Sequence, residues 1–155
     1  MTLAIVPATP GDAEAMLALQ RLAFEPEALV AQTREIPPLQ ETVDDIRAHV
    51  RGATVLKAVD GESLLGSVRG IVTDATCLIR ILVVAPQAQG RGIGAALLAA
   101  IEQAHPQIER FELTTNMAMA GNLRFYLRHG YAIVDETAYS PTIRLAFMRK
   151  PAVRR

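Results

Sequence analysis

Residues 81–95 read ILVVAPQAQGRGIGA, in which an apolar segment leads through a glycine-rich turn into the start of a helix. Gly90, Gly92 and Gly94 leave backbone N–H groups uncovered where the helix begins, because glycine has no Cβ to shield them. These N–H groups and the helix dipole create a positive charge of about half a unit, which suits a phosphate or pyrophosphate. Arg91 adds a forked donor inside the turn. The segment therefore predicts an anion-binding site between a buried strand and a helix.

The spacing of the glycines discriminates between kinds of phosphate-binding loop. A Walker loop needs Lys and then Ser or Thr after its last glycine, and this segment has neither. A dinucleotide fingerprint needs G-x-G-x-x-G, whereas these glycines follow G-x-G-x-G in the middle of the chain. Both comparisons disfavour a nucleotide site, although a nucleotide-binding module stays an alternative that thermal shifts with acetyl-CoA, ATP and NAD would test.

Strands and helices alternate on both sides of this turn. The expected strands are 3–6, 54–59, 64–72, 77–84, 111–115, 131–137 and 142–148, and the expected helices are 10–24, 43–52, 92–104 and 119–129. Segment 77–84 is apolar except for Arg80, which is typical of a central strand buried on both faces. This order predicts an α/β (α+β) fold in one domain over residues 1–155, a mixed sheet flanked by helices.

The stretch from residue 25 to 41 is the least regular part of the chain, because it contains three prolines. We expect a break at Glu25–Pro26, a short helix within 27–34 and extended backbone at Pro37–Pro38. At the other end, the basic residues Arg149, Lys150, Arg154 and Arg155 are expected to form a solvated tail.

The composition excludes several classes of protein. Lys and Arg number 16 against 16 Asp and Glu, and this zero net charge argues against a broad surface for nucleic acid or an anionic membrane. One cysteine and three scattered histidines exclude a disulfide framework and predict no metal site. The longest apolar run, 95–101, is too short to span a membrane, and the first residues lack signal-peptide features. We therefore expect a cytoplasmic protein.

Three segments together resemble one family of enzymes. Residues 89–94, QGRGIG, resemble the acetyl-CoA-binding signature Q/R-x-x-G-x-G/A of the GNAT superfamily of N-acetyltransferases. The preceding residues 82–86, LVVAP, resemble the V-x-P strand end of that family. Residues 122–131, NLRFYLRHGY, resemble its later N-x-x-x-Y-x-x-x-G-[FY] segment. The order of elements fits the family from about residue 2 to residue 150.

The resemblance implies a mostly antiparallel sheet whose central strand splays from strand 111–115 near residues 82–84. It also implies acetyl-CoA as a cosubstrate, with its pantetheine arm held by the backbone of Leu82, Val83 and Val84. The pyrophosphate would be held by Gln89, Gly90, Arg91, Gly92, Ile93, Gly94 and Ala95. Asn122 would face the pantetheine, Tyr126 would face the thioester sulfur, and the acceptor would enter beside residues 25–41.

The implied reaction is direct transfer of the acetyl group to a primary amine. An amine of pKa ~10.4 must lose a proton, which costs about 4.6 kcal/mol at pH 7. The departing thiolate needs a proton, and Tyr126 is the expected general acid. The general base stays open between Glu35, Glu41, Glu112 and a water chain. Also open are the acceptor, a small-molecule or peptide amine, the length of the acyl donor, and whether the protein forms a homodimer.

Several of these residues also have purely structural interpretations. Tyr126 is compatible with a core aromatic residue. Arg69 and Arg80 are charges inside apolar strands, where each needs either a glutamate partner or an anionic ligand. The same fold is also compatible with a non-catalytic acyl-CoA-binding or regulatory domain. Free thiol released from acetyl-CoA in the presence of amines would distinguish an enzyme from such a domain.

Overall fold

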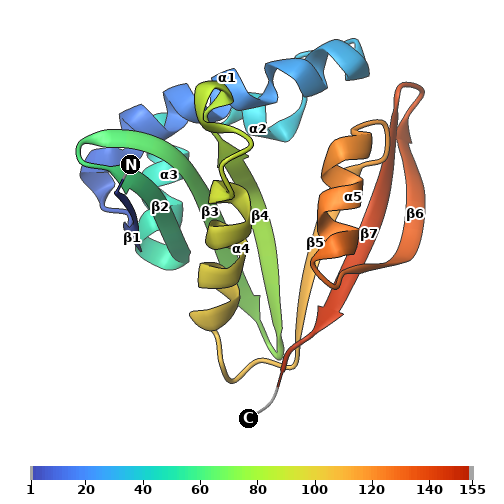
Figure 1. Cartoon of the computed structure of the whole chain (residues 1–155). Helices are drawn as coiled ribbons and strands as arrows, with labels where there is room; N and C mark the ends of the chain where they lie inside the picture. The colour runs from blue at the N-terminus through green and yellow to red at the C-terminus, as the bar shows by residue number, and fades with distance from the viewer. Residues whose placement is uncertain (1, 154–155) are drawn as a thin grey trace.

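A seven-stranded sheet forms the centre of the molecule (Figure 1). The computed structural model describes residues 2–153, and its strands are β1 (Leu3–Pro7), β2 (Thr54–Asp60), β3 (Ser63–Thr73), β4 (Thr76–Val84), β5 (Arg110–Asn116), β6 (Ala132–Ser140) and β7 (Ile143–Pro151). Their order across the sheet is β1-β2-β3-β4-β5-β7-β6. Only β4 and β5 pair in parallel, and all other neighbours are antiparallel. The predicted mixed, mostly antiparallel sheet is confirmed.

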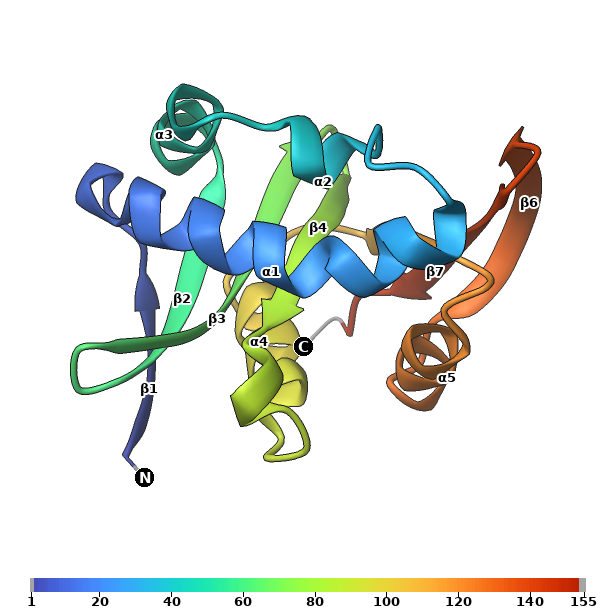
Figure 2. The ribbon, with the colours of Figure 1, turned by 90° about the horizontal axis from the view of Figure 1, so that it is seen from above.

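Helices cover the sheet and cross its open end (Figure 2). They are η1 (Pro10–Asp12), α1 (Ala13–Ala31), α2 (Pro37–Gln40), α3 (Val43–Gly52), η2 (Pro86–Ala88), α4 (Ile93–Gln103) and α5 (Ala120–Arg128). The alanine-rich α4 buries Ile93, Leu97 and Ile101 against the sheet. Gly66 of β3 permits this close approach, because a Cβ there would lie 2.7 Å from the Val83 carbonyl oxygen and 2.9 Å from Leu97 Cδ1.

The sheet divides between β4 and β5. The two strands pair only where Thr76–Leu78 lie beside Arg110–Glu112, and beyond that point they diverge into the V seen in Figure 1. In the diverging part β4 carries one extra residue opposite β3, and Ile81 has a φ of +53°, which a β-branched residue rarely adopts. The splay predicted near residues 82–84 is therefore present, and it begins directly after Leu78.

Helix α1 bridges the open end of this V. The prediction of a break at Glu25–Pro26 was wrong, because α1 continues through Pro26 to Ala31. Proline removes one helical hydrogen bond, but Ala28 and Ala31 beyond it are buried in an apolar cluster with Ile36 and Ile143. Burial of this cluster outweighs the lost hydrogen bond and keeps the helix intact.

Two other local predictions need correction. Pro37 and Pro38 begin the short helix α2 instead of an extended segment, because the first helical positions have no intrahelical use for an N–H group. Strand β4 is buried on one face only. Cys77 and Ile79 are buried, whereas Arg80 is exposed, because β4 leaves β5 after Leu78 and Arg80 has no cross-strand neighbour on that side. The remaining predicted elements are present, with ends shifted by up to three residues.

The basic residues near the end of the chain are not a separate tail. Arg149 and Lys150 belong to β7, and Lys150 Nζ lies 3.0 Å from Glu102 Oε1. The expectation for Arg154 and Arg155 concerns residues outside the described range. Within that range, no helix has the length and apolar character needed to cross a membrane.

Candidate active site

The glycine-rich turn opens α4 in the way its sequence predicts. Gly90 and Gly92 have φ values of +79° and +80°, and Gly92 is the N-cap of α4. Only open space surrounds the position of a Cβ at either glycine, so the turn presents bare backbone. Left-handed backbone at both positions explains why side chains with a Cβ are absent there. The N-terminus of α4 therefore offers uncovered N–H groups to an anion.

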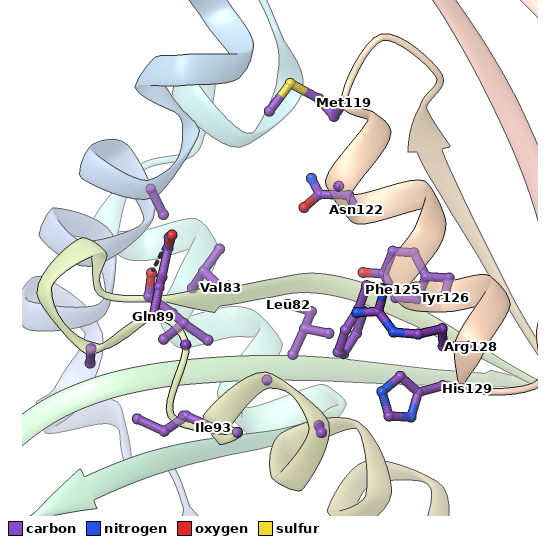
Figure 3. Close-up of a pocket in the computed structure, with 18 of the residues that line it drawn as sticks. Leu82, Val83, Gln89, Ile93, Met119, Asn122, Phe125, Tyr126, Arg128 and His129 are labelled. Carbon is purple, nitrogen blue, oxygen red and sulfur yellow. Dashed lines mark hydrogen bonds between the residues drawn. The ribbon is translucent and has the colours of Figure 1, made fainter.

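A cavity of about 620 Å³ begins at this turn and extends along β4 to α5 (Figure 3). Eleven of the twelve predicted site residues line it: Leu82, Val83, Val84, Gln89, Gly90, Gly92, Ile93, Gly94, Ala95, Asn122 and Tyr126. The exception is Arg91, whose guanidinium donates a hydrogen bond to the carbonyl oxygen of Gln87, 3.2 Å away, outside the cavity wall. We call this space the first cavity.

A second cavity, of about 610 Å³, lies between the diverging strands β4 and β5. Its wall includes Arg80 of β4, Glu112 of β5 and apolar side chains of α1, α2 and β7. The two cavities share five residues: Phe24, Glu27, Leu82, Asn122 and Tyr126. A molecule in the first cavity and a molecule in the second would therefore meet at these five residues, which we call the junction.

Tyr126 lies on α5 at the junction. Figure 3 shows Asn122 and Tyr126 on the same side of α5, directed towards the β4 wall where Leu82 and Val83 lie. Burial, and secondly the negative charge of Glu27, raise the pKa of Tyr126 to about 12. The phenol is therefore protonated at neutral pH, and it holds its proton more tightly than an ordinary tyrosine does. Tyr126 also packs edge-on against Phe125 and Tyr131, so the structural interpretation of its ring holds as well.

The three glutamates predicted as candidate bases lie in different surroundings. Glu35 is exposed and lines neither cavity. Glu112 lines the second cavity, but its Oε1 lies 3.6 Å from Arg149 Nη2. Glu41 is held by two hydrogen bonds from Arg69, of 2.9 and 3.0 Å, and lines neither cavity. Only Glu112 of the three therefore reaches a cavity wall.

The pair of Glu41 and Arg69 is structural. The Arg69 side chain is only 6% exposed, and Gln20 Nε2 donates a further hydrogen bond of 2.8 Å to Glu41. Burial alone would raise the pKa of Glu41, but the hydrogen bonds from Arg69 and Gln20 and the charge of Arg69 outweigh it and lower the pKa. Arg69 therefore has the glutamate partner that its place in an apolar strand required.

Glu27 is a functional candidate that the sequence did not reveal. It lies on α1 at the junction, half-buried, and burial raises the pKa of its carboxyl group. Among residues 2–153 it forms no ion pair and no side-chain hydrogen bond. The helical spacing of Phe24, Glu27, Ala28 and Ala31, which places a charge on an apolar face, was the available signal. The expected break at Pro26 concealed it.

The family of the chain follows from a comparison with known proteins. Residues 51–133, more than half of the chain, match the sequence model of the acetyltransferase (GNAT) domain. The protein belongs to the GNAT acetyltransferase family. No curated protein sequence matches the chain significantly.

Solved structures of acetyltransferases share the whole fold. PaiA N-acetyltransferase from Thermoplasma acidophilum, solved in complex with coenzyme A, superposes with a TM-score of 0.80 at 16% identity, over 97% of this chain and 99% of that one. The ribosomal-protein-S18-alanine N-acetyltransferase from Escherichia coli gives 0.82 at 14% identity, over 99% and 96%. YncA from Salmonella typhimurium, solved with acetyl-CoA, gives 0.77 at 17% identity, over 100% and 96%. At these identities the likeness shows the fold.

Proposed function

We propose that this protein is an N-acetyltransferase that moves the acetyl group of acetyl-CoA to a primary amine, and that residues 1–155 act as one catalytic domain. The observation that carries the proposal is the junction, where a cavity that begins at a bare helix N-terminus meets a second cavity beside the half-buried Tyr126. Such an arrangement lets two substrates approach from opposite sides and react without a covalent enzyme intermediate.

The first cavity fits the shape and charge of coenzyme A. The N–H groups of the turn at Gly90–Gly94 suit the pyrophosphate, and the groove along Leu82–Val84 suits the pantetheine arm. Beyond Leu78, β4 has no pairing with β5, which leaves the β5 side of the Leu82–Val84 backbone open to an extended ligand. The complexes of the Thermoplasma and Salmonella proteins with coenzyme A and acetyl-CoA support this assignment.

In the proposed reaction Tyr126 is the general acid and Asn122 orients the pantetheine arm. The amine nitrogen attacks the thioester carbonyl carbon at the junction, and a peptide N–H near Val83 stabilises the charge that develops on the oxygen. Tyr126 then donates its phenol proton to the departing thiolate. Coenzyme A and an acetylated small-molecule or peptide amine are the products. Among the described residues, no group of three or more His, Cys, Asp or Glu side chains is placed to hold a metal ion.

A glycine substitution tests the coenzyme A site. Gly92→Val places a side chain in the path of the pyrophosphate, and we expect the Kd for coenzyme A to rise at least tenfold in calorimetric titration. Gly61→Val is the matched control, because Gly61 also has a positive φ, of +59°, and open space around it, but it lies in the β2–β3 hairpin away from both cavities. Equal affinities of the two folded variants would contradict the assignment.

Thiol release separates an enzyme from a binding domain. The wild-type protein is incubated with acetyl-CoA and a panel comprising L-phenylalanine, L-phenylalaninamide, phenethylamine, L-lysine, spermidine and a peptide with a free N-terminus. We expect at least one amine to accelerate the release of free thiol. Tight binding of coenzyme A without thiol release for any amine would instead support a non-catalytic acyl-CoA-binding domain.

A further inference from the structure

Glu27 is the carboxylate at the junction. It lines both cavities from α1, whereas Tyr126 lines them from α5. The other titratable and charged side chains that line the two cavities are Arg80, Glu112, Tyr126, Arg128, His129 and Tyr139. Of these, only Glu112 is a second carboxylate, and Arg149 pairs with it. In the part of the chain that the structure describes, Glu27 is thus the one unpaired carboxylate that both substrates can reach.

We infer that Glu27 is the general base that takes the proton of the acceptor amine, an inference that rests on the proposed function. Within residues 2–153 no cation pairs with Glu27, so an incoming ammonium group would meet a carboxylate without a competing partner. Burial raises the pKa of Glu27 above that of an ordinary glutamate. The raised pKa is closer to neutral pH, and the carboxylate is therefore a stronger base. Glu41 is neither unpaired nor a stronger base, since it forms an ion pair with Arg69 and its pKa is lowered.

The charge of Glu27 affects the pKa of Tyr126, and this coupling favours proton transfer from Tyr126 once Glu27 has taken up the amine proton. Ionised Glu27 is the second cause, after burial, of the raised pKa of Tyr126. When Glu27 accepts the amine proton its negative charge disappears, so the pKa of Tyr126 falls and the phenol becomes a better donor to the thiolate. Proton uptake by Glu27 thereby makes proton release by Tyr126 easier.

The protons balance over the full reaction. The ammonium loses its first proton to Glu27, the nitrogen lone pair forms the C–N bond, and the C–S bond breaks. The thiolate takes the Tyr126 proton, and the second amine proton restores the phenol. Glu27 then returns its proton to solvent, so one proton is released for every thiol formed.

Glu27→Gln tests this inference, because it keeps the size of the side chain and removes the base. With the best acceptor of the panel, we expect kcat/KM at pH 7 to fall at least tenfold while the Kd for coenzyme A changes less than twofold. Glu35→Gln is the control, since Glu35 is exposed and lines neither cavity, and it should retain wild-type activity.

The pH profile distinguishes a lost base from a disturbed structure. The kcat/KM of the wild type should level off above the pKa of Glu27, whereas that of Glu27→Gln should keep rising about tenfold per pH unit towards the amine pKa. Parallel pH profiles of the wild type and Glu27→Gln, or an unchanged kcat/KM in the variant, would overturn the role of Glu27 but leave the proposed function standing. No thiol release by the wild type with any amine would overturn the proposed function and this role together.

A separate observation concerns the charge of the second cavity. Arg80 and Arg69 lie directly opposite each other in the β3–β4 ladder, an unfavourable placement of like charges. Glu41 neutralises Arg69, but Arg80 forms no ion pair within residues 2–153 and its side chain is exposed at the wall of the second cavity. Arg80 does not line the first cavity, so its charge is available to the acceptor and not to coenzyme A.

We infer that Arg80 binds a carboxylate of the acceptor, which is therefore an apolar amino acid or a close analogue. Apolar side chains dominate the rest of the second cavity, among them Phe24, Ile36, Leu78, Leu145 and Phe147. Arg80 is only two residues from Leu82 along β4, a separation that the arginine side chain and an α-amino acid together can span. The amine end then lies at Glu27 and the carboxylate end at Arg80.

A pair of acceptors that differ in one charge tests this second inference. We expect the wild type to prefer L-phenylalanine over L-phenylalaninamide at least tenfold in kcat/KM, although the amine of the amide loses its proton more readily. Arg80→Gln should abolish the preference mainly by raising KM for L-phenylalanine. Arg51→Gln, an exposed arginine on α3 outside both cavities, should keep it. Equal use of both acceptors by the wild type, or a preference that survives in Arg80→Gln, would overturn the inference.

Discussion

Replacing Tyr126 with phenylalanine is expected to slow acetyl transfer about 10²-fold or more while the affinity for acetyl-CoA stays nearly unchanged. Phenylalanine keeps the ring and its edge-on packing against Phe125 and Tyr131, so the variant removes only the hydroxyl group that supplies the proton. A general acid contributes on the order of 10²–10⁴-fold to a rate, and solvent is a poor substitute at a half-buried junction. Single-turnover measurement of thiol formation isolates the chemical step from product release.

The contrast between Tyr126 and Tyr131 supplies the control for this experiment. Tyr131 is almost fully buried, and its hydroxyl donates a hydrogen bond of 2.6 Å to Glu102, on the α4 side of the sheet. Tyr131→Phe should therefore lower stability without a comparable loss of rate. Wild-type single-turnover rates in Tyr126→Phe would show that Tyr126 is a core aromatic residue and that solvent protonates the thiolate.

Glu41→Gln is expected to lower the free energy of unfolding by about 3 kcal/mol at pH 7. The substitution leaves the guanidinium of Arg69 buried without a counter-charge, and breaking a buried pair in this way costs on the order of 3–5 kcal/mol. Such a loss is a large fraction of the ~5–15 kcal/mol that stabilises a typical domain. Urea denaturation measures it directly.

The pH dependence of this effect has a defined sign. Because the pKa of Glu41 is lowered in the folded protein, its contribution is fully present above the ordinary glutamate pKa of ~4.3 and is lost as the pH falls through the folded-state value. The stability difference between wild type and variant should therefore narrow in acid. Glu25→Gln is the matched control, since Glu25 pairs with Arg34 at the surface and should lose less than ~1 kcal/mol. Equal stability of wild type and Glu41→Gln at pH 7 would contradict the structural role of the pair.

The parts of the site that the sequence predicted are those encoded by short segments. The turn at residues 89–95 and the helical pair Asn122 and Tyr126 depend on local spacing, and the structure brings all of them except Arg91 to one cavity. The role of Glu27 depends instead on whether α1 survives Pro26, and contacts with Ile36 and Ile143, up to 117 residues away, decide that. The exposure of Arg80 likewise depends on where β4 leaves β5, which no local pattern around Arg80 records.

Helix α1 is packed at both of its ends, and this packing allows the second cavity to change separately from the glycine-rich turn. Its first turns pack with Ile46 and Val55 in one arm of the V, and its last turns pack with Ile143 in the other. Since β4 and β5 are joined by only three residue pairs, the packing of α1 against both arms sets the distance between them. Insertions or substitutions in α1 would reshape the second cavity and the junction while the turn at Gly90–Gly94 stays intact. A protein with this architecture can therefore change the second cavity through one segment and keep its anion-binding turn in another.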